Sequence, residues 1–584
     1  MVTDAVTVGV EAGIPQNHSP PVICHLAIHL MDHKTMYQCS GMEKHNNGDV
    51  TNKIFGVYTS QLWEVFKRYD LGQNKLPITS LRAAFNELSL FPSNSQILEM
   101  VHCAVEYGSP CVANHITFGE FCVLVVELQH HYEKAPPLPP PKSLLKRRGE
   151  TSERRRRKES SANFQVFLGG SCNPTTWRHD IAIPHFKKHA ITFYNPQVNN
   201  WRPELIELED RAKQAATLLF FVIDNQTRAV VSMVEVAYLN GCHRQTVVVF
   251  NNYNWEWLEM QGNMLSQREK SDLIRARNVL MDIVERNGVP IFDNIQKGLD
   301  CATTVVKQSI RVQDLTAIHG AQPVLYGHTQ AGEALLKLRE TFNSVTGNAE
   351  GKIIKDDVCL GYKCYSGQEL SIQWLQQQRR SQNSFTFEEF CCIVTEFRKK
   401  KPSPLTTLLT RLLYPVTWIL GKLRPPEELP EADDTRDIYL GGSCGESSWR
   451  DEIAIPLLKR HGLSYMNPHV TDWMARLIPM QVALRERCRL LLYIFTENTR
   501  GLAAMVEAGY YIGLGCRVVL CMQKLKQGTV IAGEELTEEA LCDYNRGRMY
   551  LSDMASRQGV AVFESTVDAV NSAISQLREQ AASR

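Results

Sequence analysis

The sequence predicts two α/β domains with doubly wound parallel sheets, each preceded by a small all-α module. Three observations predict this architecture: one segment occurs twice, each copy alternates apolar strands with helical stretches, and a helical pattern recurs ahead of each copy. At 584 residues the chain is too long for one compact core, so several domains are expected.

The repeat is the strongest of these signals. Residues 167–184 read FLGGSCNPTTWRHDIAIP and residues 439–456 read YLGGSCGESSWRDEIAIP, a shift of 272 residues with 11 of 18 positions identical. The same shift, without a gap, pairs Trp201 with Trp473 and MVE at 233–235 with MVE at 505–507. Each copy is long enough for its own core, which predicts a tandem of domains and excludes a solenoid.

Short apolar runs within each copy predict the strands. The run TLLFFVI is apolar throughout, as expected for a parallel strand buried on both faces. Alternation of such runs with helical stretches predicts a Rossmann-like parallel sheet, with ligands at the carboxyl ends of its strands. The predicted strands are 165–168, 191–194, 217–223, 246–250 and 289–292, then 437–440, 463–466, 490–495, 517–521 and 560–563.

The region ahead of each copy also repeats. ITFGEF at 116–121 resembles FTFEEF at 385–390, and LWEVF at 62–66 resembles LRETF at 338–342. Helix, loop, apolar residue, Thr and then an acid is an EF-hand-like pattern, and such modules could receive protein partners. In the second loop of the first module, only the final ligand position keeps its acid, Glu120. The loop most similar to a calcium-binding one, 346–357, lacks the first Asp, so we expect no calcium binding. A four-helix packing module is the plain alternative.

These patterns divide the chain into seven segments. A disordered tail (1–54) precedes the first EF-hand-like module (55–134), a Pro-rich and basic linker (135–162) and the first α/β domain (163–318); the second module (319–400), an apolar and Pro-containing linker (401–435) and the second α/β domain (436–584) follow. The basic cluster 146–158 is either a nuclear-localisation signal or a solvated charge run. Residues 404–421 are apolar but contain Arg411 and Pro415, which favours a packed linker helix or an interfacial contact over a membrane span.

Composition excludes several classes of protein. The 64 Lys and Arg residues nearly balance 63 Asp and Glu residues, which argues against a duplex nucleic acid as partner. The 17 cysteines are spread along the chain and no signal peptide is visible, so we expect a cytoplasmic protein, or a nuclear one if the basic cluster acts as a signal. We expect no metal, although Cys24, His25, His29, His33 and Cys39 lie close together, and no cofactor. The oligomeric state stays open.

A glutamate in each copy is the candidate for chemistry. Glu235 lies in VVSMVEVAYLNG and Glu507 in GLAAMVEAGYYIGLG, both predicted helices that are apolar on nearly every side. A carboxylate there is costly unless it is paired or functional. The alternative is a glutamate at a helix edge, salt-bridged to an arginine such as Arg178 or Arg450.

Other residues follow the predicted strands and meet at the same edge. They are Gly169, Gly170, Ser171, Asn195, Trp201, Asp224 and Asn225 in the first copy, and Gly441, Gly442, Ser443, Asn467 and Trp473 in the second. Trp201 can stack on a base or belong to the core.

Together these motifs resemble the nucleoside 2-deoxyribosyltransferase-like superfamily, over about 163–312 and 436–581. The overall arrangement is also similar to animal proteins of the Raw type. The resemblance implies glycosyl transfer, in which a helix glutamate attacks C1′ of a nucleoside and displaces the base. Glu235 and Glu507 match that nucleophile, and Asp224 matches the acid at the strand end.

The resemblance also implies that the second copy has lost acids. Glu207 and Glu209 match an acidic position ahead of strand three, where the second copy has Pro479 and Gln481; Thr496 replaces Asp224. Two hypotheses follow. The chain either binds a nucleoside or nucleotide and cleaves or exchanges its N-glycosidic bond in the first copy, or it is a catalytically silent signalling scaffold that binds ligands or partners through the same domains.

Overall fold

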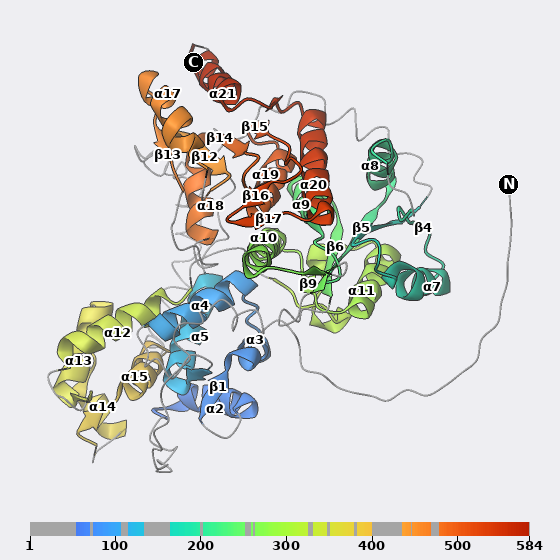
Figure 1. The fold of residues 1–584 in the computed structure, drawn as a ribbon. Helices are drawn as coiled ribbons and strands as arrows, with labels where there is room; N and C mark the ends of the chain where they lie inside the picture. The colour runs from blue at the N-terminus through green and yellow to red at the C-terminus, as the bar shows by residue number, and fades with distance from the viewer. Residues whose placement is uncertain are drawn as a thin grey trace, which may run out of the picture.

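The computed structural model in Figure 1 describes most of the two repeats and of the helical regions. The described residues are 54–70, 74–106, 115–133, 164–198, 202–251, 259–260, 263–324, 331–346, 351–378, 382–399, 435–444, 447–468 and 478–582. The expectations for the N-terminal tail and its His and Cys residues, for the basic cluster, for 404–421, for Trp201 and for Trp473 lie outside these residues.

Each repeat folds around a five-stranded parallel sheet, which confirms the predicted α/β class. In domain one the order is β4-β3-β5-β6-β9, and in domain two the equivalent order is β13-β12-β14-β15-β18. The strands are β3 (Val166–Gly170), β4 (Phe193–Tyr194), β5 (Leu218–Asp224), β6 (Thr246–Asn251), β9 (Ile291–Phe292), β12 (Arg436–Gly442), β13 (Tyr465–Met466), β14 (Cys488–Phe495), β15 (Val518–Met522) and β18 (Val562–Phe563).

Helices connect the strands on both faces of each sheet. Two of them, α10 and α20, begin at a hydroxyl cap, where Ser266 or Thr537 accepts a hydrogen bond from the helix's third backbone N–H. The helices are α7 (Ile183–Lys188), α8 (Leu205–Ala215), α9 (Val230–Gly241), α10 (Gln267–Arg286) and α11 (Ile295–Gln308), then α17 (Ile455–Arg460), α18 (Ile478–Glu486), α19 (Leu502–Gly513), α20 (Glu538–Arg557) and α21 (Thr566–Ala582). Short hairpins pair β7 (Glu259–Met260) with β8 (Asn263–Met264) and β16 (Val530–Ile531) with β17 (Glu534–Glu535).

The edge strands β4 and β13 are joined to the neighbouring strands β3 and β12 by side chains at equivalent positions, neutral in domain one and charged in domain two. In domain one Gln165 accepts a hydrogen bond from the Thr192 backbone N–H at 3.0 Å. In domain two Asp437 accepts from the Ser464 N–H and hydroxyl at 2.9 and 2.8 Å and pairs with Arg489 at 2.7 Å. Burial alone would raise the pKa of Asp437, but these partners outweigh burial and lower it.

The two α/β domains pack directly against each other through α9 and α19 (Figure 1). The helices cross closely because each carries a glycine: a Cβ on Gly241 would lie 2.2 Å from the Tyr510 carbonyl oxygen, and one on Gly513 would lie 2.1 Å from that of Tyr238. One apolar core consequently runs through both domains. The outer face of the second sheet has a smaller core of its own.

The helical regions form two modules that share a second core (Figure 1). In each, two helix–strand–helix units meet through a short antiparallel pair, β1 (Lys75–Pro77) with β2 (His115–Thr117) and β10 (Ile353–Ile354) with β11 (Ser384–Phe385). This order matches the expected layout, whereas the EF-hand-like identity stays a prediction. The helices are α2 (Val57–Tyr69), α3 (Ile78–Glu87), α4 (Asn94–Glu106) and α5 (Phe118–Glu133), then α12 (Glu333–Val345), α13 (Lys355–Ser366), α14 (Ile372–Gln378) and α15 (Phe387–Lys399).

The acids that end two of the loops already have protein partners. Glu120 accepts from the Thr117 N–H at 2.9 Å and pairs with Arg339 of the other module at 3.0 Å. Glu389 accepts from the Thr386 N–H at 2.7 Å and from Gln382 at 2.8 Å. A calcium ion at either loop would have to compete with these bonds, and the absence of calcium binding stays a prediction.

Among the described helices, none is long and apolar enough to cross a membrane. None of the described cysteines forms a disulfide, and within the same ranges no three His, Cys, Asp or Glu side chains are grouped to hold a metal ion.

Candidate functional site

The turn that ends the first strand has the same geometry in both domains, at Gly170 and Ser171 and at Gly442 and Ser443. Gly170 has φ of 107°, and a Cβ there would lie 2.0 Å from the Val222 carbonyl oxygen, so only glycine fits. The next residue, Ser171, joins two elements: its hydroxyl accepts from the Asp224 N–H at 2.9 Å and bonds the Thr227 hydroxyl at 2.7 Å. In domain two Ser443 contacts the Thr496 N–H and the Thr499 hydroxyl in the same way. The two serines therefore fix the loop at the carboxyl edge of the sheet.

Arg178 and Arg450 bind the backbone of this loop in their respective domains. The Arg178 guanidinium, 1% exposed, donates to the carbonyl oxygens of Leu168 at 3.0 Å and of Ser171 at 2.6 Å. Arg450 bonds the equivalent carbonyls of Leu440 and Ser443. Neither arginine pairs with the helix glutamates, so the salt bridge considered for them from the sequence is wrong: backbone carbonyls already occupy these guanidinium groups.

Glu235 pairs instead with a buried lysine. Lys213 on α8 forms a close ion pair with Glu235 on α9 and lies 3.5 Å from Glu209, one turn earlier on α8. Lys213 and Glu235 are each 7% exposed. Burial raises the pKa of Glu235 although Lys213 opposes the shift, and burial alone would lower the pKa of Lys213, but Glu235 and Glu209 outweigh it and raise that pKa. Two carboxylates thus share one cation.

Glu507 has a different partner at the equivalent position. Arg485 on α18 bonds Glu507 at 2.5 Å and donates to the Tyr439 hydroxyl at 3.2 Å. Position 485 lies 272 residues after Lys213, and Gln481 stands where domain one has Glu209. The guanidinium therefore faces one carboxylate rather than two. The sequence reading missed Lys213 and Arg485, although the constant shift aligns a cation at this position in both copies.

Asp224 ends β5, as predicted, but both of its oxygens are engaged. One accepts from the Gln226 backbone N–H at 2.9 Å and the other from the Asn251 side chain at 2.8 Å. The residue is 2% exposed. In domain two Glu497, next to Thr496, pairs with Lys526 and is directed to solvent.

The remaining predicted residues divide between turns and the domain interface. Asn195 accepts from the Gln197 N–H at 3.0 Å and so forms a turn; Asn225 is half-buried in the loop after β5, and Asn467 follows β13. Glu207 points away from Glu235 and pairs with Arg211 and with Arg557 of domain two. Glu209 also accepts from the Tyr550 hydroxyl of domain two at 3.0 Å.

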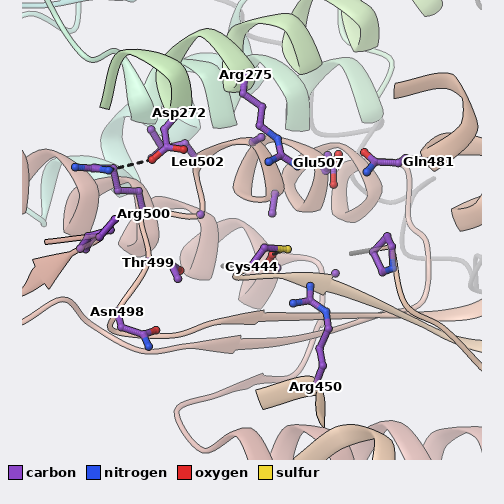
Figure 2. Close-up of a pocket in the computed structure, with 18 of the residues that line it drawn as sticks. Asp272, Arg275, Cys444, Arg450, Gln481, Asn498, Thr499, Arg500, Leu502 and Glu507 are labelled. Atoms are coloured by element: carbon purple, nitrogen blue, oxygen red, sulfur yellow. Dashed lines mark hydrogen bonds and ion pairs between the residues drawn. The ribbon is translucent and has the colours of Figure 1, made fainter. Parts of the chain in front are cut away.

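A cavity of about 540 Å³ lies over the carboxyl edge of the second sheet, and Glu507 lines it. Figure 2 shows Arg275 extending from α10 of domain one toward Glu507 and Cys444, opposite Arg450. Gly441, Gly442, Gln481, Thr499 and the start of α19 complete the wall. Domain one therefore supplies part of the domain-two cavity.

Reciprocal ion pairs hold this arrangement. Arg500 of domain two pairs with Asp272 on α10 at 3.1 Å, and its equivalent in domain one, Arg228, lies 3.5 Å from Asp543 on α20. The sequence reading missed these pairs. Asp272 and Asp543 are separated by 271 residues, one fewer than the repeat, so they fall out of the ungapped register.

Comparison with known proteins agrees with the repeat. A sequence profile of the family described as "Nucleoside 2-deoxyribosyltransferase like" matches residues 163–253 and again residues 435–525. None of the curated proteins or solved structures compared with the chain matches it significantly. The two matched segments contain the parallel sheets up to β6 and β15, with Glu235 and Glu507 at equivalent positions. The chain therefore carries two nucleoside 2-deoxyribosyltransferase-like domains in tandem.

Proposed function

We propose that this protein binds a nucleoside or nucleotide in the domain-two cavity and holds it without cleaving it. The observation that carries the proposal is the cavity itself: a family carboxylate, Glu507, lies in the wall of a space large enough for such a ligand. The cavity sits at the carboxyl ends of the strands, where ligands bind in open parallel sheets.

The surroundings of Glu507 favour binding over turnover. In glycosyl transfer a carboxylate oxygen attacks C1′, the C1′–N bond breaks, and its electron pair goes to the base, which must receive a proton from an acid. Domain two offers Thr496 and Gln481 where the resemblance requires acids. Among the described residues, Asp272 is the other carboxylate lining the cavity, and it is paired with Arg500. Glu507 itself is bonded to Arg485, a cation that it does not share with a second carboxylate as Glu235 shares Lys213 with Glu209.

Turnover in domain one is the second candidate. The observation in its favour is that Glu235 and Glu209 share Lys213, so one carboxylate can stay ionised while a second acid lies nearby. Asp224 is a weaker candidate for the catalytic acid than the resemblance implies, because both of its oxygens already accept hydrogen bonds.

Calorimetry and product analysis on the full chain test both candidates. We expect a deoxynucleoside or its phosphate to bind, and we expect Ala504→Phe, which fills the domain-two cavity, to abolish that binding. Ser232→Phe, at the equivalent position in domain one, is the matched control and should leave it intact. Absence of binding to any member of a nucleoside and nucleotide panel would refute the proposal.

Chromatography of the same mixtures for free base decides the second candidate. Release of base that Glu235→Gln stops would establish domain one as an enzyme, since loss of a nucleophile costs several orders of magnitude in rate. Base release that survives Glu235→Gln would remove Glu235 as the nucleophile.

A further inference from the structure

The two candidate sites differ by one charge at equivalent positions. Glu209 of domain one lies within the ion-pair network of Lys213, whereas its counterpart in domain two, Gln481, is neutral and lines the cavity. A ligand with a negative charge would therefore meet an additional carboxylate in domain one that is absent in domain two. At close range in a partly buried site, one such charge changes affinity substantially.

A cation from the other domain enters the domain-two cavity. Arg275 lies on α10, and Figure 2 shows its guanidinium directed into the space bounded by Glu507, Cys444 and Arg450. Burial lowers the pKa of Arg275 although Glu507 and Asp272 oppose the shift. The guanidinium remains charged at neutral pH, so an additional anion beside it would offset its desolvation.

The protein backbone at the cavity also favours an anion. The first turn of α19, from Leu502 to Ala504, lines the wall, and no side chain caps this helix at Gly501. Backbone N–H groups at the start of a helix attract negative charge. Arg500 lines the same end of the cavity.

We propose that the domain-two cavity is specific for a phosphorylated nucleoside, whose phosphate is bound by Arg275 of domain one. This inference rests on the proposed function and specifies its ligand. The nucleoside moiety lies against Glu507 and Gln481, and the phosphate lies toward α10. Binding therefore depends on both domains, because the residue that distinguishes a nucleotide from a nucleoside comes from the neighbouring domain.

Isothermal titration of the full chain tests this assignment. The probes are a deoxynucleoside, its 5′-monophosphate, ribose 5-phosphate and inorganic phosphate. We expect the monophosphate to bind at least tenfold more tightly than the nucleoside. We also expect it to bind more tightly than either phosphate compound that lacks a base, since both parts of the ligand contribute.

Two variants and a control assign the effect to residues. Arg275→Gln removes charge-assisted hydrogen bonds and should weaken monophosphate binding about ten- to a hundredfold, with nucleoside binding unchanged. Gln481→Glu reproduces the charge of domain one and should also reduce the preference for the monophosphate. Arg546→Gln, at the position on α20 equivalent to Arg275, is the control and should leave monophosphate affinity in this cavity unchanged. Melting temperatures check that each variant is folded.

The possible failures are distinguishable. Equal affinity for nucleoside and monophosphate, or an unchanged preference in Arg275→Gln, would overturn the inference and leave the proposed function standing. Ribose 5-phosphate binding as tightly as the monophosphate would overturn recognition of a nucleoside. If none of the four probes binds, the proposed function itself fails.

Discussion

Replacing Glu507 by Gln should destabilise the protein much more than replacing Glu235 by Gln. Each substitution removes one partner from a buried ion pair and keeps the shape of the side chain. The cations left behind differ: Lys213 still has Glu209 at 3.5 Å, whereas for Arg485, 2% exposed, the position equivalent to Glu209 holds the neutral Gln481. The apolar sequence around Glu235 alone would predict a neutral effect of losing its charge, whereas the ion pair with Lys213 predicts a loss of stability.

The expected magnitudes follow from these partners. Leaving a buried charge uncompensated costs about 3–5 kcal/mol, so we expect a loss in that range for Glu507→Gln. The Tyr439 hydroxyl, 3.2 Å from Arg485, compensates only weakly because it is neutral. For Glu235→Gln we expect about 1–2 kcal/mol, the cost of one charge-assisted hydrogen bond whose cation keeps a second carboxylate.

Hydrogen exchange followed by mass spectrometry measures both losses in the intact chain, because peptides from β5 and β14 report each domain separately. In Glu507→Gln, exchange in β14 should accelerate by about a hundred- to several-thousandfold; in Glu235→Gln, β5 should accelerate about tenfold.

A double variant is the control. Arg485→Met combined with Glu507→Gln removes both charges and should recover most of the lost protection. Equal acceleration of exchange in the two single variants, or no recovery in the double variant, would show that Glu209, the second carboxylate near Lys213, does not account for the difference in stability.

Three further predictions concern the rest of the molecule. Because the folded pKa of Asp437 is lowered, the contribution of this residue to stability is present above its unfolded pKa and is lost as the pH falls below about 3.8, so that hydrogen exchange in β12 and β13 should accelerate. Strands β3 and β4 are joined through the uncharged Gln165 and should not respond to pH in this way. An equal response of both strand pairs would contradict this prediction. Millimolar calcium should leave the melting temperature of the chain where a chelator leaves it; a rise of several degrees would show a site in the helical modules. Gly513→Ala and Gly241→Ala should each weaken the packing of α9 against α19 by about 1–3 kcal/mol, because the added methyl group would collide with the partner helix. Faster limited proteolysis of the chain should report this loss. An unchanged rate of proteolysis would show that the two helices can move apart with no loss of stability.

Most of the secondary structure and the equivalence of the two domains could be predicted from local sequence. The apolar run at 217–223 corresponds to β5, displaced by one residue at each end, because a strand buried on both faces must be apolar throughout. Glu235 and Glu507 were identified because a carboxylate within an apolar helix is energetically conspicuous wherever the helix lies. These inferences need only the order of residues along the chain.

The sequence also contains a signal for the packing of the two domains, the apolar helix around Glu235, but that signal has more than one interpretation. The helix around Glu235 is apolar on nearly every side because one face packs on its own sheet and the other on α19. In the sequence, the same pattern is equally consistent with a helix buried within one domain. Gly241 and Gly513, which allow the close crossing, look like ordinary helix-terminal glycines until the partner helix is placed.

The sequence determined where the carboxylates lie and in which fold; the tertiary structure decided what faces them. Lys213 meets Glu235 only because α8 lies beside α9, and Arg275 enters the domain-two cavity only because two domains, joined by an apolar helix pair, bring α10 over a sheet to which it does not belong. Such contacts depend on which elements pack together and leave no helical or strand periodicity in the sequence, since a single charged side chain has the same sequence context whether it meets solvent, a carboxylate or a ligand.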